Sequence, residues 1–208
     1  MQLLLLLLGV AGLLAAGFAA LNGKISWPWV LPLLALVAFL GWREWERHRE
    51  LQAYSAVASE LAGHPSEVSC QRRTDPSAAV GVYEGYVPYP SNPEELPTRA
   101  ELSPNTCAAL KSYREEQADP TRDEVAAVHV LTHESMHLKN LRGEAEAECA
   151  AVQRDSRTAE LLGASEEEAR SLAEAYYRDF YPDLPSSYRS GKCVKDGEWD
   201  EHLGLGPW

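Results

Sequence analysis

The stretch Val125-Ala-Ala-Val-His-Val-Leu-Thr-His-Glu-Ser-Met-His-Leu138 decides the fold of this 208-residue chain. Apolar residues lie on nearly all sides of a helix drawn through it, and a helix that is apolar all round is buried. Thr121 followed three residues later by Glu124 is a capping box, which predicts the start of this helix. The alternative is an exposed helix face, for which the apolar flanks are a poor match.

Two histidines on this helix are four residues apart and therefore share one face. His133 and His137 have the spacing that binds one Zn²⁺ ion, and Glu134 between them is placed to act as general base on a metal-activated water. Two histidines and a glutamate are costly to bury without partners, and a divalent metal satisfies all three. The sequence therefore predicts a zinc site on the buried helix.

A catalytic zinc site needs a third protein ligand. A tight connection follows His137, and a strong helix former begins at Glu144. If the two helices form an antiparallel hairpin, Glu144 and Glu148 share the face toward the histidines, and Glu146 points elsewhere. We expect Glu148 to be the third ligand, with Glu144 either replacing it or orienting a ligand histidine. The alternative is that all three glutamates are ordinary solvated helix residues.

These residues carry a family resemblance. His133 to His137 followed by a glutamate-bearing helix resembles the zincin metallopeptidases, and more narrowly the gluzincins, whose third zinc ligand is a glutamate on a following helix. The stretch from Thr132 to Cys149 also resembles small uncharacterised bacterial membrane-anchored proteins with a zincin-like core. The resemblance covers Asp119 to Gln153 and implies a zinc-dependent peptidase with His133 and His137 as ligands. One departure is that the gap to the candidate glutamates is shorter than in large gluzincins.

Further polar residues are candidates for supporting roles. His129 lies one turn before His133 on the same face, so it is either a group that orients a ligand, part of the pocket wall, or simply a buried and hydrogen-bonded histidine. The reaction also needs a donor to the developing oxyanion. Tyr188 and His202 near the C-terminus are the candidates for that donor.

The N-terminal residues 1–42 are apolar and contain one charged side chain, Lys24. Two uncharged runs, 3–21 and 27–42, predict a transmembrane hairpin, and tryptophans at both ends of the second run suit the two membrane interfaces. The alternative for the first run is a cleaved signal peptide, although it lacks a basic n-region. Residues 43–63 are predicted to form a helical stalk that ends at Gly63, and residues 64–208 a zincin-like domain.

Four cysteines lie beyond the apolar runs: Cys70, Cys107, Cys149 and Cys193. None forms a CxxC pair, so they are disulfide candidates, for instance Cys70 with Cys107 and Cys149 with Cys193 among three connectivities. Disulfides favour an extracytoplasmic domain on the cell membrane. The arginines that follow the second run favour the cytoplasm instead, and the alternative for the cysteines is four buried thiols. We expect the extracytoplasmic side.

The charge of the chain restricts its partners. The formal charge of −12 becomes −13 for residues 43–208, because Lys24 is the only charged residue before Arg43. An acidic domain argues against nucleic acid, although an acidic surface also serves solubility alone.

The fold class predicted for the whole chain is α+β and mostly helical, with a small antiparallel sheet. The strand candidates are 80–87 and 99–102. Ser103-Pro104 predicts the start of a helix, and Ser165 with Glu168 predicts another that Pro182 stops. The helix from Glu144 is expected to continue to Gly163.

The function predicted is a membrane-anchored zinc metallopeptidase that hydrolyses peptides or proteins. The alternative is a catalytically inactive membrane-anchored interaction module with a structural or vestigial zinc site. An intramembrane protease fits poorly, because His133 lies far beyond the second apolar run in a charged neighbourhood.

Overall fold

The computed structural model describes residues 27–71, 84–204 and 206–208, and before them only positions 9, 12, 17–19, 21 and 22. The chain divides into two compact units, Met1–Arg49 and Glu50–Trp208. Most of the predicted first span, 3–21, lies outside the described residues. The predicted second span, 27–42, forms the first part of helix α2 (Trp27–Ala62).

The exposed part of α2 carries apolar side chains, among them Leu33, Leu36, Phe39 and Leu40. Among the residues that the structure describes, no helix is both long and apolar enough to cross a membrane, and this includes α2.

The second part of α2 belongs to the compact unit of residues 50–208. Tyr54, Val57 and Ala58 are spaced at threes and fours and are buried in the core, as their spacing predicts. The helix ends at Ala62, and Gly63 follows with a φ of 81°, a left-handed conformation that glycine adopts without strain. The predicted end of this helix is therefore confirmed.

In the part of the chain that the structure describes, three short strands form one sheet in the order β1-β3-β2. The strands are β1 (Glu67–Cys70), β2 (Gly85–Tyr86) and β3 (Arg99–Leu102). The expectation of an antiparallel sheet is right for β2 with β3 and wrong for β1 with β3, which run parallel. Parallel pairing needs a long connection, and the chain between β1 and β3 is long enough to return in the same direction. Of the predicted strand 80–87, residues 80–83 lie outside the described residues.

Of the helices that follow, those preceded by Ser103, Thr121 and Ser165 begin where these caps predict. Ser103, Thr121 and Ser165 each accept a hydrogen bond from a backbone N–H of the helix they precede, and the last two form capping boxes with Glu124 and Glu168. The elements are α3 (Pro104–Glu115), α4 (Arg122–Leu138), α5 (Glu144–Val152), α6 (Asp155–Leu161), α7 (Glu166–Asp179) and a short 3₁₀ turn, η2 (Tyr181–Asp183).

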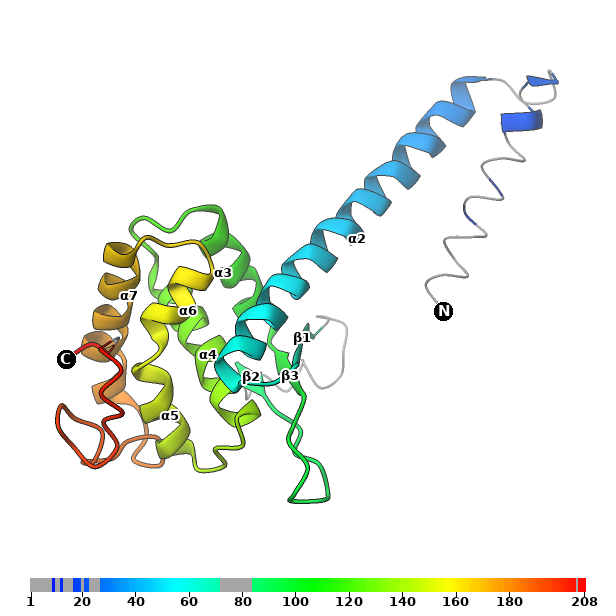
Figure 1. The fold of residues 1–208 in the computed structure, drawn as a ribbon. Coiled ribbons are helices and arrows are strands. Elements are labelled where there is room, and N and C mark those ends of the chain that lie inside the picture. The colour runs from blue at the N-terminus through cyan, green and yellow to red at the C-terminus, as the bar shows by residue number, and fades with distance from the viewer. Residues whose placement is uncertain are drawn as a thin grey trace. The chain divides into compact units, whose positions relative to one another are not determined.

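Helix α4 is the centre of this unit (Figure 1). It packs against α3, α5, α6, α7 and the strands β2 and β3. From Glu124 to Leu138 every residue is buried except Ala126 and Val130, which are partly buried. The prediction of a buried helix is confirmed, and its polar side chains must therefore find partners inside the protein.

The expected continuous helix from Glu144 to Gly163 is wrong, because the chain turns at Gln153 and Arg154 between α5 and α6. The Gln153 amide donates to the backbone carbonyl of Trp199, and Arg154 pairs with Glu201. These partners lie in the C-terminal segment, so the break depends on tertiary contacts that helix propensity does not record.

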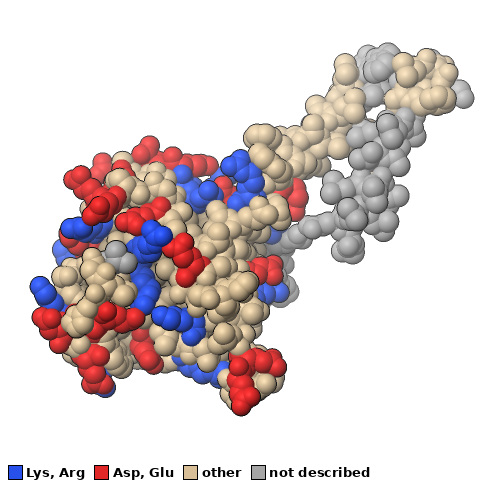
Figure 2. Space-filling model, in the orientation of Figure 1, with Lys and Arg blue, Asp and Glu red and all other residues tan. Residues whose placement is uncertain are grey.

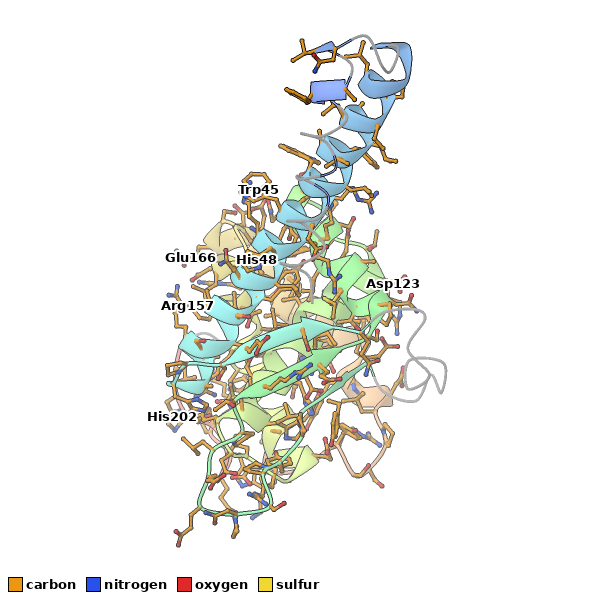
Figure 3. The ribbon with its side chains drawn as sticks, turned by 90° about the vertical axis from the view of Figure 1, so that its right-hand side faces the viewer. Trp45, His48, Asp123, Arg157, Glu166 and His202 are labelled. Carbon is orange, nitrogen blue, oxygen red and sulfur yellow. A yellow bond between two sulfur atoms is a disulfide. The ribbon has the colours of Figure 1, made fainter. Side chains whose placement is uncertain are left out.

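Two disulfides link elements that are distant in the sequence. Cys70 bonds to Cys107 and joins β1 to α3, and Cys149 bonds to Cys193 and joins α5 to the C-terminal segment. The predicted pairing is confirmed. Another cross-link is the ion pair of Arg157 on α6 with Glu60 on α2, and Arg157 lies beside α2 in Figure 3. On the face shown in Figure 2, acidic and basic side chains are interspersed over residues 50–208.

Candidate metal centre

A pocket of about 600 Å³ lies along α4. The three residues of the predicted motif, His133, Glu134 and His137, line it from α4, and Glu144 and Glu148 line it from α5. The remaining wall comes from β2, from the loop with Tyr89, from α7 and from the segment 184–188. The helix hairpin expected from the sequence therefore brings the predicted residues to one pocket.

The Nδ1 atoms of the two motif histidines have separate partners. Nδ1 of His133 lies 2.9 Å from Oε2 of Glu148, and Nδ1 of His137 lies 2.7 Å from the carbonyl oxygen of Leu141. Carbonyl and carboxylate oxygens accept hydrogen bonds, so each Nδ1 carries the hydrogen. With Nδ1–H bonded to these acceptors, Nε2 is the nitrogen that can give up its hydrogen to a metal, the arrangement that metal-binding histidines use.

The two Nε2 atoms meet at a single carboxylate oxygen. Oε2 of Glu144 lies 3.2 Å from Nε2 of His133 and 3.3 Å from Nε2 of His137. The Glu144 side chain is 42% exposed, so this group faces the open side of the pocket. Two imidazoles and one carboxylate are a donor set that suits Zn²⁺.

Two groups of side chains in the described residues of this pocket could hold a metal ion. One is His133, His137 and Glu144, and the other is the fully buried cluster of His129, His133 and Glu148; within each group the ligand atoms lie within 4.8 Å of one another. Glu148, the third ligand expected from the sequence, is therefore grouped with His129 instead of His137. Glu144, the alternative, is the carboxylate that reaches both motif histidines.

Glu134 is buried beside these ligands. Its Oε2 atom has no hydrogen-bond partner among the described residues, which is unusual for a buried carboxylate. The backbone of β2 covers it so closely that a Cβ atom at Gly85 would lie 2.5 Å from Oε1 of Glu134. Burial raises the pKa of Glu134 to about 7. A carboxyl group with a pKa near neutrality can both take and release a proton.

The histidines and carboxylates shift one another's pKa values in the metal-free protein. Burial alone would lower the pKa of His133, but its bonds to Glu144 and Glu148 outweigh burial and raise it to about 9. The bond from His133 in turn lowers the pKa of Glu144. Burial and the neighbouring His133 lower the pKa of His137. The pocket thus favours a positive charge between His133 and the carboxylates.

A buried hydrogen-bond network extends behind His133. Nε2 of His129 lies 3.0 Å from Oε2 of Glu148, and Nδ1 of His129 lies 2.9 Å from Oδ2 of Asp155. Tyr176 donates to Oε1 of Glu148 at 2.9 Å and stacks on the His129 ring at 3.5 Å between centroids. Burial would lower the pKa of His129, but the two carboxylates raise it to about 10.

Sequence reasoning did not find every residue of the pocket. Asp155 reaches His129 only because of the break between α5 and α6, for which the sequence has no local signal. The helical spacing of Tyr176 does not show that its hydroxyl donates to Glu148. Tyr89 lies in the connection between β2 and β3, outside the predicted motif, and its hydroxyl lies 3.0 Å from Nδ1 of His137.

The two candidate oxyanion donors lie in different places. Tyr188 lines the pocket, with its ring centroid 5.8 Å from that of His133, and burial followed by Glu144 raises its pKa. His202 lies in the exposed C-terminal segment (Figure 3), and it pairs with Asp200. It is not among the residues that line the pocket. Of the two, only Tyr188 can reach a molecule bound there.

Comparisons of the chain with protein-family models, with curated proteins and with solved structures found no match. Any functional assignment therefore depends on the residues of the pocket.

Proposed function

We propose that the chain is a zinc-dependent peptidase whose metal is held by His133, His137 and Glu144. The observation that carries the proposal is the convergence of both Nε2 atoms on Oε2 of Glu144 while both Nδ1 atoms are occupied by other acceptors. Coordination through Nε2 with Nδ1–H bonded to a carboxylate or carbonyl is the usual arrangement of histidine ligands.

The buried cluster of His129, His133 and Glu148 is less suited to catalysis. Both ring nitrogens of His129 already face carboxylates, and the Glu148 carboxylate already has three donors. A catalytic site also keeps a coordination position open to water and substrate. Glu144 lies on the exposed side of the pocket, whereas the side chain of Glu148 is only 2% exposed. We therefore assign Glu148 the role of orienting His133.

Different pocket residues have different roles in the proposed reaction. A bound zinc ion would polarise the peptide carbonyl and increase the acidity of water. The Glu134 carboxylate takes a proton from the attacking water and delivers it to the leaving amine, so the carboxylate is restored when the peptide bond has been cleaved. Tyr188 donates a hydrogen bond to the carbonyl oxygen as negative charge develops on it. The volume of the pocket is within the range that accommodates a small peptide segment.

The test is hydrolysis of a peptide library by the purified full chain and by its Glu134→Gln variant. Glutamine has the same size but cannot accept the proton, so we expect at least a hundredfold loss of turnover with unchanged zinc content. The matched control is Glu146→Gln on the exposed face of α5, which should behave as wild type. Retained activity in Glu134→Gln would reject the general-base role. Zinc binding without any hydrolysis by the wild type would instead favour the inactive interaction module.

We also propose that residues 1–42 attach the protein to a membrane, with the domain on the extracytoplasmic side. The exposed apolar side chains of α2 support attachment, and the two disulfides support an oxidising compartment. Cell fractionation tests the attachment: the full chain should stay in the membrane pellet after a carbonate wash, and a chain without residues 1–42 should not. Recovery of the full chain in the supernatant would contradict it.

A further inference from the structure

We infer that His129 is a positioning residue: its Nε2–H holds the Glu148 carboxylate in the orientation that fixes His133 for metal binding. The inference rests on the proposed function, because it assumes that Nε2 of His133 is a zinc ligand. It concerns a residue that does not touch the proposed metal position and that acts through two others.

The contacts form one continuous path through the core. Oδ2 of Asp155 bonds to Nδ1 of His129 at 2.9 Å, Nε2 of His129 bonds to Oε2 of Glu148 at 3.0 Å, and the same oxygen bonds to Nδ1 of His133 at 2.9 Å. All four side chains are at least nine-tenths buried. Carboxylates only accept, so both ring nitrogens of His129 donate.

The Glu148 carboxylate needs this donor to keep its orientation. Tyr176 donates to Oε1, which leaves Oε2 to be oriented by His129 and His133 together. If the bond from His129 is lost, Oε2 is held by the His133 ring alone, and the two side chains can turn together. Nε2 of His133 would then no longer be held in the position from which it binds the metal.

Several contacts fix the orientation of the His129 ring. Asp155 accepts from one nitrogen, the Tyr176 ring stacks on one face, and the residue is only 3% exposed. Buried charged groups are costly even when paired, so a histidine between two carboxylates stabilises the fold less than apolar packing would.

Two amide variants of the full chain separate positioning from packing. In His129→Gln the side-chain amide nitrogen lies where Nε2 lies in the wild type, so the variant can still donate a hydrogen bond to Glu148. In His129→Asn the side-chain amide nitrogen lies where Nδ1 lies, so this variant can donate to Asp155 but not to Glu148. Each variant removes one hydrogen bond and leaves one buried carboxylate with one donor fewer. The thermal unfolding temperature of the metal-free protein should therefore be lower in both variants than in the wild type.

The readout is the zinc dissociation constant from competition with a chelator. We expect His129→Asn to weaken zinc binding by about 10- to 100-fold and His129→Gln by no more than about threefold, because only the first loses the donor to Glu148. Equal effects of the two amides, or no effect of either, would overturn the inference and leave His129 a structural residue. The absorption spectrum of the cobalt-substituted protein gives a second readout, and we expect it to change in His129→Asn and not in His129→Gln.

A third variant, His137→Ala, shows whether a negative result contradicts this inference alone or also the proposed function. His137→Ala should abolish zinc binding if the ligand set is right. If it retains zinc while both amide variants lose it completely, the metal lies in the cluster of His129, His133 and Glu148, and both assignments are wrong. If either amide variant fails to fold, long-range nitrogen–proton correlation spectra of the wild type decide. A hydrogen on Nε2 of His129 in the zinc-loaded protein supports the inference, and a bare Nε2 overturns it.

Discussion

The position of one hydrogen on each imidazole ring decides what the pocket can bind. His133 and His137 both direct Nδ1 to an acceptor inside the protein and Nε2 to the same oxygen of Glu144. The sequence predicts the two histidines and the general base from local spacing alone. It does not predict which hydrogen-bond acceptors orient the rings, because these come from the following loop and from another helix.

Gly85 lies so close to the Glu134 carboxylate that a side chain at this position would displace it. We expect Gly85→Ala to lower kcat/KM at least tenfold, about 1.4 kcal/mol of transition-state stabilisation, because the added methyl would displace the buried carboxylate. Zinc content should not change, since Glu134 is not a ligand. Steady-state kinetics beside metal analysis checks this.

The control for that substitution is Gly191→Ala. A Cβ at Gly191 meets no atom within 4 Å, so this variant should keep wild-type kinetics. Activity of Gly85→Ala within twofold of wild type would show that Glu134 tolerates displacement, contrary to the role proposed for it.

The third ligand shows the limit of residue-level prediction. Glu144 and Glu148 lie on one face of α5, as predicted, and both reach His133. Which of them also reaches His137 depends on how the chain turns between α4 and α5. Asn140 adopts a φ of 71° in that turn, a left-handed conformation that sequence alone does not specify.

At the scale of elements, local signals predicted the starts of helices and missed their interruptions. Ser103, Thr121 and Ser165 cap their helices through bonds within a few residues, so their sequence neighbours suffice to identify them. The turn at Gln153 depends on Trp199, and the direction of β1 relative to β3 depends on a long connection. Such contacts between distant residues cannot be read from periodicity.

The disulfide between Cys149 and Cys193 joins α5 to the segment that carries Tyr188. Replacing both cysteines by serine should lower the free energy of unfolding by about 2–4 kcal/mol, because the open chain gains conformational entropy when unfolded. Cys149 follows Glu148 directly, so kcat/KM should fall as well. Denaturant unfolding and steady-state kinetics measure the two effects.

The disulfide between Cys70 and Cys107 provides the comparison, because it joins β1 to α3 and neither of these elements lines the pocket. Its removal should destabilise the protein and change kcat/KM less. An equal loss of activity in both double variants would contradict a specific role of the Cys149–Cys193 link in the pocket wall.

For the molecule as a whole, the candidate site lies within the unit of residues 50–208, whose centre is the buried helix α4. A ligand that binds only the folded state stabilises it by mass action, by about 4 kcal/mol at a free concentration a thousand times the dissociation constant. We therefore expect chelation to lower the Tm of the full chain by about 10 °C.

The matched variant for that experiment is His137→Ala, which should unfold at the same temperature with and without chelator. A wild-type Tm that does not respond to chelator, or a response of the same size in His137→Ala, would show that the metal is not bound by the proposed ligands.

The most direct test of the account is the zinc content of the purified full chain, measured for the wild type and for Glu144→Ala. The account predicts about one zinc ion per chain in the wild type and almost none in the variant, because Glu144 reaches Nε2 of both His133 and His137 and no other carboxylate of the described residues does. A wild-type protein without zinc, or a Glu144→Ala variant with the wild-type content, would contradict it.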